Sequence, residues 1–448
     1  MVVASAAKGE KKTPVTIDDR LQLFVDRYLI DALAGAELRL HSPQPREVAI
    51  PFDRPWEGPV SFYVTVRVDG DTYRAYYRGQ PGVGHPEVTC YAESKDGIVW
   101  TKPALGLYEF QGSTENNILW MGEGTHNFTP FLDQNPAARP EERYKALAGG
   151  PLIALCSPDG IHWRKLRDEP VITQGAFDSQ NLAFWDSARG RYAAYFRGFR
   201  DDVRAVLTAT STDFLNWTEP EWIDLGDSRP EHFYTNATTP YFRAPEILLC
   251  FPKRFVPERT WNPEHGHPGL SDGLFLTSRD GRRFDRTFLE AFIRPGPDPE
   301  NWTERNIGIA YGVVPTGPGE ISLYWVEHYR HPTCRLRRGV LRTDGFVSLH
   351  AGYAGGEALT RPLLFAGKEL VLNFATSAAG SVRVELQDEK GKPLPGFSLA
   401  ECPAIYGDEL ERVVRWRDGA DVSSLAGRRV RLRFRLQDAD LYSFRFRG

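Results

Sequence analysis

The sequence predicts an all-β protein, a five-bladed β-propeller followed by a C-terminal β-sandwich, on three observations. A motif of the form Ser-x-Asp-Gly-x-x-Trp recurs along the chain, an apolar strand and an aromatic strand precede each copy, and the pattern changes after residue 350. A self-similar period of several tens of residues, built on strands, is typical of propeller blades.

The motif occurs five times, with between 54 and 67 residues from one aspartate to the next. The third copy has Phe214 where most have Gly, and the fifth is shorter; the copies begin at Ser94, Ser157, Ser211, Ser278 and Thr343. Asp followed by Gly favours a tight turn, because Asp bonds its own backbone and Gly accepts a positive φ. We therefore interpret the motif as structural, with its closing aromatic ring packed between neighbouring blades.

Three segments are expected: an N-terminal extension at 1–50, a catalytic propeller at 51–350 and a β-sandwich at 351–448. Within the extension, 21–33 is helix-like and 37–41 is strand-like. The strand is expected to close the ring by pairing with the last blade, which would hide two sheet edges. After His350, hydrophobic residues alternate with period two, which predicts an antiparallel sandwich with one face in water.

The bulk composition excludes several classes of partner. The 448 residues carry 55 basic and 59 acidic side chains, a formal net charge of −4, which argues against nucleic acid or a membrane as an obligate partner. No apolar run approaches the roughly 20 residues that a membrane-spanning helix requires. The odd cysteine count and the position of four of them in predicted strands predict buried free thiols at Cys90, Cys156, Cys250 and Cys334.

The N-terminal residues leave the location of the protein open. Met1–Ala7 lacks the long apolar core of a signal peptide. The protein is periplasmic or secreted if an export signal was trimmed, and otherwise cytoplasmic. The sequence gives no indication of an oligomeric state.

The chemistry is expected on one rim of the ring. In a propeller, the loops that enter the first strands and those that join second to third strands share a rim, and the Asp-Gly turns lie on the other. Carboxylates on that functional rim suit glycosidic-bond cleavage, in which one protonated acid donates to the leaving oxygen and one ionised acid activates water or attacks the sugar. The predicted catalytic residues are Asp178 and Glu57 as nucleophile or base and supporting carboxylate, Glu327 as leading proton donor, and Asp272 and Glu231.

Aromatic, amide and basic side chains on the same rim are predicted to bind the substrate. Aromatic rings stack on sugar faces and amides bond hydroxyls, while a local excess of cations would favour an anionic substrate: a uronate, a sulfated sugar, or phosphate as co-substrate. The predicted substrate-binding residues are Trp56, Arg78, Asn127, Gln180, Asn181, Arg197, His232, Asn236, Lys253, Arg254, Asn306, His328 and Arg330.

No cofactor and no metal site is expected. His265 and His267 have a metal-like spacing, but no third ligand accompanies them. A structural calcium ion in the channel stays open, since no ligand set for it stands out.

The blades, about 51–350, resemble the five-bladed propeller glycosidases of glycoside hydrolase families 32, 43, 68 and 130. The sandwich after the propeller is similar to family 32 in particular, and 107–117 with Asp178-Ser179-Gln180-Asn181 resembles family-32-like proteins of environmental bacteria. Family 32 has an Asp in a Trp-x-Asn-Asp-Pro-like entry to blade one, where this chain has Asp53-Arg54-Pro55-Trp56-Glu57, so Glu57 or Asp53 would take its place. The Arg-Asp-Pro and Glu-Cys signatures are absent as such, and Phe177-Asp178 and Glu327-His328 occupy counterpart positions.

The sequence thus predicts a glycoside hydrolase that cleaves O-glycosidic bonds of a plant, algal or microbial glycan, with a carbohydrate as its partner. Three alternatives stay open: a glycoside phosphorylase that uses inorganic phosphate, a non-catalytic glycan-binding propeller, and a lyase that acts on uronates.

Overall fold

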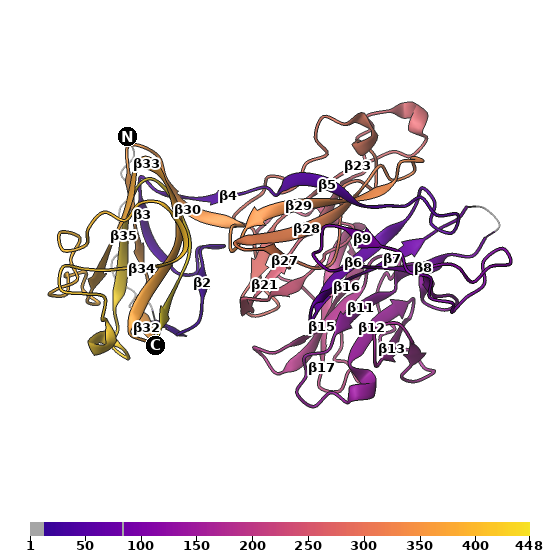
Figure 1. Cartoon of the computed structure of the whole chain (residues 1–448), viewed down its shortest axis with the longest axis horizontal. Coiled ribbons are helices and arrows are strands. Elements are labelled where there is room, and N and C mark those ends of the chain that lie inside the picture. Colours follow the sequence, from indigo (N-terminus) through magenta and orange to yellow (C-terminus); the bar gives the residue numbers. More distant parts are fainter. Residues whose placement is uncertain (1–12, 83–84) are drawn as a thin grey trace. The chain divides into compact units, whose positions relative to one another are not determined.

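The computed structural model describes residues 13–82 and 85–448, and in this part of the chain every regular element longer than three residues is a β-strand (Figure 1). The chain divides into two compact units: Ser42–Thr343, and Asp344–Gly448 together with the described part of Met1–His41. Of the helices in the described residues, none has the length and apolar character that a membrane crossing requires. The expectation for Met1–Ala7 concerns residues outside the described part.

The described part of Ser42–Thr343 contains five antiparallel sheets of four or five strands and one small three-stranded sheet. The first contains β6 (Phe62–Asp69), β7 (Thr72–Gly79), β8 (Val88–Ser94), β9 (Trp100–Thr101) and β10 (Ile118–Trp120). The second contains β11 (Thr129–Leu132), β12 (Tyr144–Gly149), β13 (Leu152–Ser157) and β14 (Arg164–Lys165), with the 3-10 helices η1 (Thr125–Asn127) and η2 (Pro140–Glu142). The third contains β15 (Leu182–Asp186), β16 (Arg191–Arg200), β17 (Val203–Ser211) and β18 (Glu221–Trp222).

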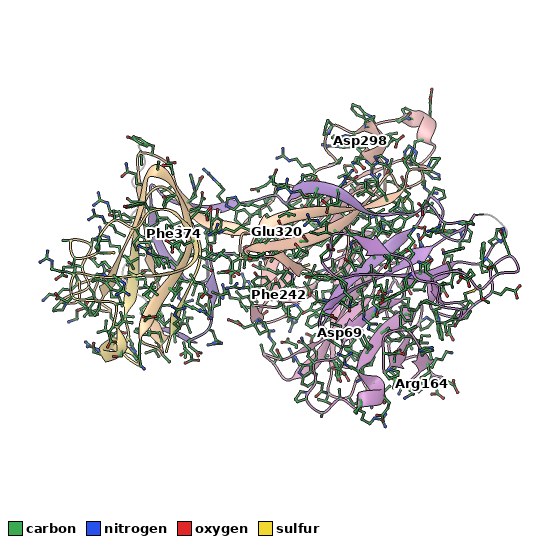
Figure 2. All side chains as sticks on the ribbon, in the orientation of Figure 1. Asp69, Arg164, Phe242, Asp298, Glu320 and Phe374 are labelled. Atoms are coloured by element: carbon green, nitrogen blue, oxygen red, sulfur yellow. The ribbon has the colours of Figure 1, made fainter. Side chains whose placement is uncertain are left out.

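The fourth and fifth sheets complete this unit. The fourth contains β20 (Thr239–Tyr241), β21 (Ala244–Cys250), β24 (Leu276–Ser278) and β25 (Phe284–Asp285). A small sheet beside it in sequence contains β19 (His232–Phe233), β22 (Lys253–Val256) and β23 (Leu270–Gly273), with η3 (Pro263–His265). The fifth contains β26 (Gly308–Ile309), β27 (Val314–Gly317), β28 (Glu320–Glu327), β29 (Arg335–Arg342) and β5 (Gln44–Pro51), and η4 (Pro299–Asn301) precedes it. Figure 2 labels Asp69 at the end of β6 and Glu320 at the start of β28.

Hydrogen bonds between sheets and one shared cavity connect the five sheets. Backbone bonds join β6 to the segment at Tyr311 in the fifth sheet, and the Tyr311 hydroxyl donates to the carbonyl of Ala183 in the third sheet at 2.9 Å. The Arg67 guanidinium lies 3.4 Å from the Thr239 hydroxyl of the fourth sheet. A cavity of about 390 Å³ is lined by residues of all five sheets, among them Arg67, Phe131, Phe184, Thr239 and Val314.

The repeated motif forms the expected turn. The Ser94 hydroxyl accepts from the backbone N–H of Gly97 at 2.9 Å, the Asp96 carboxylate accepts from the next two N–H groups, and the Trp100 indole donates to the Gly97 carbonyl. The second and third copies repeat these contacts. In the third copy Phe214 adopts φ 68°, the left-handed region that Gly occupies elsewhere, with its ring fully buried. The structural interpretation of the motif is confirmed.

The fifth copy differs from the other four. Asp344 itself has φ 63°, and its carboxylate accepts from the hydroxyl of Ser443 at 2.7 Å and from the amide of Asn373 at 3.2 Å. In this shorter copy the aspartate thus contacts two strands of the C-terminal unit, β33 (Glu369–Gln387) and β35 (Arg431–Arg447).

The second unit is built on one large sheet. Its strands are β2 (Gln22–Leu23), β3 (Ile30–Ala34), β4 (Glu37–Leu40), β30 (Val347–Ala351), β31 (Gly356–Thr360), β33 (Glu369–Gln387), β34 (Asp408–Val413) and β35 (Arg431–Arg447). A parallel pair, β1 (Val15–Asp18) with β32 (Leu363–Phe365), and η5 (Ser423–Leu425) complete it. Buried and less buried residues alternate along much of β35, and Phe434 and Phe444 lie in one apolar cluster with Leu370 and Phe374, as the period-two pattern predicts.

Two expectations for the N-terminal segment are wrong. Residues 21–33 form no helix; they supply β2 and β3, because pairing with β35 and β31 and burial of Leu23 and Phe24 outweigh the local helical pattern. The strand at 37–41 does not close the last blade, since β4 pairs with β30 inside the C-terminal unit. The next strand, β5, pairs with β29 of the fifth sheet instead. The four cysteines predicted to be free thiols are buried and form no disulfide, which confirms that prediction.

Candidate functional site

Asp178 precedes β15, where the chain enters the third sheet, and anchors a group of polar side chains. Its Oδ1 lies 3.0 Å from Nε2 of His126 and accepts from the Tyr63 hydroxyl at 3.5 Å, and its Oδ2 lies 3.7 Å from Nη2 of Arg197. The Asp178 side chain is 67% exposed. Partial burial opposes its ionisation, but the hydrogen bond from His126 and the charge of Arg197 hold the pKa of the carboxyl below its ordinary value.

His126, in η1, lies between two carboxylates. Its Nδ1 is 2.8 Å from Oε2 of Glu87, so Asp178 and Glu87 engage opposite nitrogens of one ring. Burial works against the charged imidazolium, yet the two carboxylates raise the pKa of His126 above its ordinary value. For Glu87, burial is outweighed by His126 and the nearby Arg78, which lower the pKa of the carboxyl. The contacts of the two carboxylates, Glu87 and Asp178, thus favour the protonated form of the His126 imidazole.

A cavity of about 520 Å³ opens onto these groups. Asp178, Glu87 and His126 line it, together with Pro86, Gly122, Gly124, Thr125, Asn127, Gly149, Gly150 and Phe177. Gly124 has φ 87°, and a Cβ there would lie 2.7 Å from the Cβ of Ala148, so a larger residue would crowd the wall. The cavity is large enough for a sugar ring and presents an acid and a base to it.

A second set of side chains, the cationic group, surrounds the ring of Tyr234. Lys253 Nζ lies 4.0 Å from the ring centroid, and the guanidinium carbons of Arg305, Arg197 and Arg204 lie at 4.4, 5.0 and 5.4 Å. These cations come from β22, the loop before β26, β16 and β17. Arg197 joins the group to Asp178.

Glu57, a predicted catalytic acid, is fully buried in a closed set of contacts. It accepts from the Tyr77 hydroxyl at 2.6 Å, from Lys102 Nζ at 2.7 Å and from the backbone N–H of Arg54 at 2.9 Å. All of these partners belong to the first sheet or the loops around it. Within the described residues, no hydrogen bond or ion pair joins Glu57 to Asp178.

The three other predicted acids also lie in ion pairs apart from Asp178. Glu327 is buried, and its Oε2 lies 3.1 Å from Nε of Arg335 and 3.0 Å from Nε of Arg337. Asp272 and Glu231 both pair with Arg254: Oδ2 of Asp272 lies 2.6 Å from its Nη2, and Oε1 of Glu231 lies 3.2 Å from its Nη1. Burial, and to a smaller extent the charge of Glu231, raises the pKa of Asp272 despite its two bonds from Arg254.

The predicted amides are buried and bonded mainly to the backbone. Asn127 bonds both the N–H and the carbonyl of Gly149 and the carbonyl of Phe177, which fixes the wall of the cavity. The others hold neighbouring loops in the same way: Gln180, Asn181, Asn236 and Asn306.

Two of the remaining predicted binding residues contact the groups described above, Arg78 and His232, and two contact other residues, Arg330 and Trp56. Arg78 lies 4.9 Å over the Tyr63 ring and 3.8 Å from Glu87. His232 lies 3.4 Å from the guanidinium of Arg204, and burial and then that charge lower its pKa. Arg330 donates to Glu304 at 2.7 Å. Trp56 donates to the amide oxygen of Asn117 at 2.6 Å.

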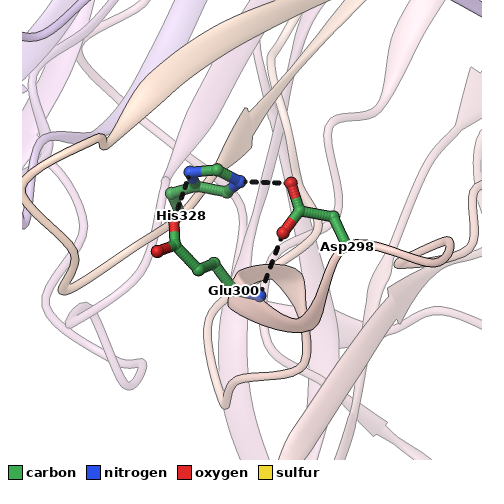
Figure 3. Close-up of side chains that lie close together, drawn as sticks. All are labelled: Asp298, Glu300 and His328. Carbon is green, nitrogen blue, oxygen red and sulfur yellow. Dashed lines mark hydrogen bonds and ion pairs between the residues drawn. The ribbon is translucent and has the colours of Figure 1, made fainter.

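His328 lies between two other carboxylates (Figure 3). Its Nε2 is 2.8 Å from Asp298 and its Nδ1 2.8 Å from Glu300, a grouping with the geometry to hold a metal ion. Arg335 Nη2 lies 3.0 Å from the same Nε2 and 3.5 Å from Asp298. Because the guanidinium of Arg335 already lies beside the Asp298 carboxylate, we interpret the contacts of His328 as hydrogen bonds and ion pairs among these side chains, not as a metal site.

Several residues of the site were not among the predicted ones: Tyr63, Glu87, His126, Arg204, Tyr234 and Arg305. Glu87 lies in the loop between the second and third strands of the first sheet, and His126, Tyr234 and Arg305 lie in loops that enter first strands. The rule for the functional rim therefore covers them. Tyr63 and Arg204 are strand residues, and only coordinates reveal their position.

The chain matches no family model and no curated protein. Among solved structures it is similar to a glycosyl hydrolase from Bacteroides ovatus, with 14% identity, TM-score 0.46, and coverage of 68% of this chain and 94% of that one. It is also similar to a member of the glycoside hydrolase 130 family of mannoside phosphorylases and hydrolases, with 15% identity, TM-score 0.40, and coverage of 69% and 94%. An α-L-arabinofuranosidase from Fusarium graminearum shows 11% identity, TM-score 0.41, and coverage of 68% and 98%. Identities and TM-scores this low do not indicate which reaction the site catalyses, so only the residues of this chain indicate its chemistry.

Proposed function

We propose that the chain is a glycoside hydrolase that cleaves an O-glycosidic bond in the cavity lined by Asp178, Glu87 and His126. The observation that carries the proposal is the pairing of an exposed carboxylate with an imidazole, 3.0 Å apart, on the wall of a sugar-sized cavity. The lowered pKa of Asp178 favours an ionised base, and the raised pKa of His126 favours a protonated acid beside it.

The proposed roles follow from those protonation states. Asp178 accepts a proton from water as the water oxygen bonds to the anomeric carbon. The glycosidic C–O bond breaks, and the leaving oxygen takes the proton of the His126 imidazolium. The proton on Asp178 then passes to His126 across their hydrogen bond, which restores both groups, while Glu87 holds the ring in place.

Replacing the two groups tests the proposal. Asp178→Asn keeps the size of the side chain and removes the base, so we expect about a 10³-fold loss of hydrolysis on a glycan library, and His126→Gln is expected to lose about 10²-fold. Asp201→Asn, at the exposed turn between β16 and β17, is the matched control. Unchanged turnover in the Asp178→Asn variant would remove it from the mechanism. Release of a sugar phosphate that requires added phosphate would identify the phosphorylase alternative, and binding without cleavage the non-catalytic one.

A lyase reaction on uronates is the second candidate, and Tyr63 is the observation that favours it. Burial, and then the neighbouring Tyr234, raise the pKa of this phenol well above its ordinary value, so it stays protonated beside Asp178. Asp178 would remove the C5 proton, the C4–O bond would break as the C4=C5 double bond forms, and Tyr63 would protonate the leaving oxygen. The unsaturated product absorbs in the near ultraviolet, whereas a hydrolysis product does not.

The proposal extends to the fold around the site. We propose that the five sheets of Ser42–Thr343 form a closed five-bladed propeller and that the C-terminal unit is a β-sandwich. The cavity lined by all five first strands and the pairing of β5 with β29 support the closed ring. The proposed catalytic region remains 51–350.

A further inference from the structure

The cationic group around Tyr234 has too few negative partners. Arg197 contacts Asp178, but within the described residues Lys253, Arg204 and Arg305 form no ion pair. The acid whose charge acts on Lys253, Glu304, already pairs with Arg330 at 2.7 Å and with His265 at 3.2 Å. Several positive charges therefore face one carboxylate, which is itself engaged by His126.

Lys253 differs from the arginines of the cationic group because it is fully buried without a polar partner. Its side chain is fully buried, and its Nζ has no hydrogen-bond partner; it lies against the π faces of Tyr234 and Phe62. Burial, and then the charge of Arg305, lower the pKa of Lys253 well below its ordinary value. Burial without a polar partner favours the neutral amine, so the positive charge of the group lies on its three arginines.

The guanidinium groups differ from Lys253 in their access to solvent. Arg204 and Arg305 are partly exposed, whereas Arg197 is almost completely buried. Planar guanidinium groups match carboxylate, sulfate and phosphate oxygens with paired donors. Arg204 and Arg305 can therefore contact a ligand directly, and Arg197 adds positive charge beside them.

We propose that Arg204 and Arg305, backed by Arg197, bind an oxyanion carried by the substrate, a sugar carboxylate or a sulfate ester. This inference rests on the proposed function, because Arg197 links the cationic group to Asp178. An anion there would complete the charge balance that the chain leaves open. It would also orient the sugar so that its glycosidic bond meets Asp178 and His126.

Ligand binding to the full-length protein tests this independently of turnover. Ligand-observed NMR titrations compare methyl glucuronide, glucose 6-sulfate, methyl glucoside and inorganic phosphate. We expect the acidic sugars to bind at least tenfold more tightly than methyl glucoside, and Arg204→Gln and Arg305→Gln each to weaken acidic-sugar binding about tenfold. Arg164→Gln, which removes the same charge from exposed β14 (labelled in Figure 2), should change it less than twofold.

Each outcome separates the inference from the proposed function. Equal binding of glucuronide and glucoside, or unchanged binding in both arginine variants, overturns the inference, and hydrolysis of neutral glycans would then leave the proposed function intact. Arginine-dependent binding of acidic sugars without any cleavage supports the inference and overturns the hydrolase proposal. Binding of phosphate with no preference among the sugars assigns the oxyanion to free phosphate and overturns the sugar-borne anion.

Discussion

Replacing Glu57 by Gln separates a structural acid from a catalytic one. The carboxylate is fully buried and lies 2.7 Å from Lys102 Nζ, whose side chain is only 10% exposed. The Gln amide has one acceptor oxygen, which in the place of Oε2 still accepts from Arg54 and Lys102, while its NH2 group faces Tyr77. The main loss is therefore the negative charge that strengthens the bond from a poorly solvated ammonium. Such bonds contribute about 1.5–3 kcal/mol, and Lys102 keeps Asp53 at 3.0 Å, so we expect a loss of about 2 kcal/mol. Glu57→Ala also removes the two other bonds and should lose about 3–5 kcal/mol.

The assay is denaturant unfolding followed by tryptophan fluorescence, with hydrolytic activity measured below the transition. Asp178→Asn, at a side chain that is 67% exposed, should change stability by less than about 0.5 kcal/mol. The double variant Glu57→Gln with Lys102→Met removes both charges and should recover much of the loss. If Glu57→Gln abolished turnover while leaving the unfolding free energy unchanged, the assignment of Glu57 to an internal ion pair would be refuted.

Three further predictions concern pH and backbone geometry. The rate of hydrolysis should follow a bell-shaped pH profile. The acid limb should lie below the ordinary Asp pKa of 3.8 because the pKa of Asp178 is lowered, and the alkaline limb should lie above the ordinary His pKa of 6.5 because the pKa of His126 is raised. His126→Gln should remove the alkaline limb. Gly312→Ala should lower the unfolding free energy by about 3 kcal/mol, since Gly312 has φ 137° and a Cβ would lie 2.1 Å from the carbonyl oxygen of Val66; denaturant unfolding checks this. At pH values between the lowered pKa of Lys253 in the folded protein and its unfolded pKa of 10.5, the lysine is protonated in the unfolded chain but not in the folded one. The stability of the fold should therefore rise with pH in this range, and Lys253→Met should flatten that rise in thermal unfolding.

The repeated turn could be predicted because its signal is local. The contacts of Ser94 and Asp96 join residues a few positions apart, so a short motif contains everything the turn requires. The third copy shows the limit of that rule, since Phe214 takes a glycine conformation and packs its ring against Phe131 and Tyr192. The N-terminal strands were harder to place, because β2 and β4 find their partners more than 300 residues later in the chain.

The site was only partly predictable for a related reason. Loop position identifies which residues reach the functional rim, and it selected Asp178, Arg78, Arg197 and Lys253. It does not say which acids meet each other, because that depends on partners from other blades. Glu57 carries the same charge as Asp178 and also lies in a loop that leads into a first strand. It is nevertheless buried and forms an ion pair with Lys102.

Charge is the property for which composition is least informative here. A chain with a net charge of −4 indicates an acidic protein overall, but the charges that act on a ligand are those within about a Debye length of it. Around Tyr234, two strands of the third sheet and the loop before β26 bring three guanidinium groups together, and low-dielectric surroundings strengthen their combined potential. A negative molecule can therefore be repelled weakly by the whole surface and attracted strongly at one point. Raised ionic strength should then weaken acidic-sugar binding while leaving neutral-sugar binding unchanged, and equal salt dependence for both would show that the cationic group does not contact the ligand.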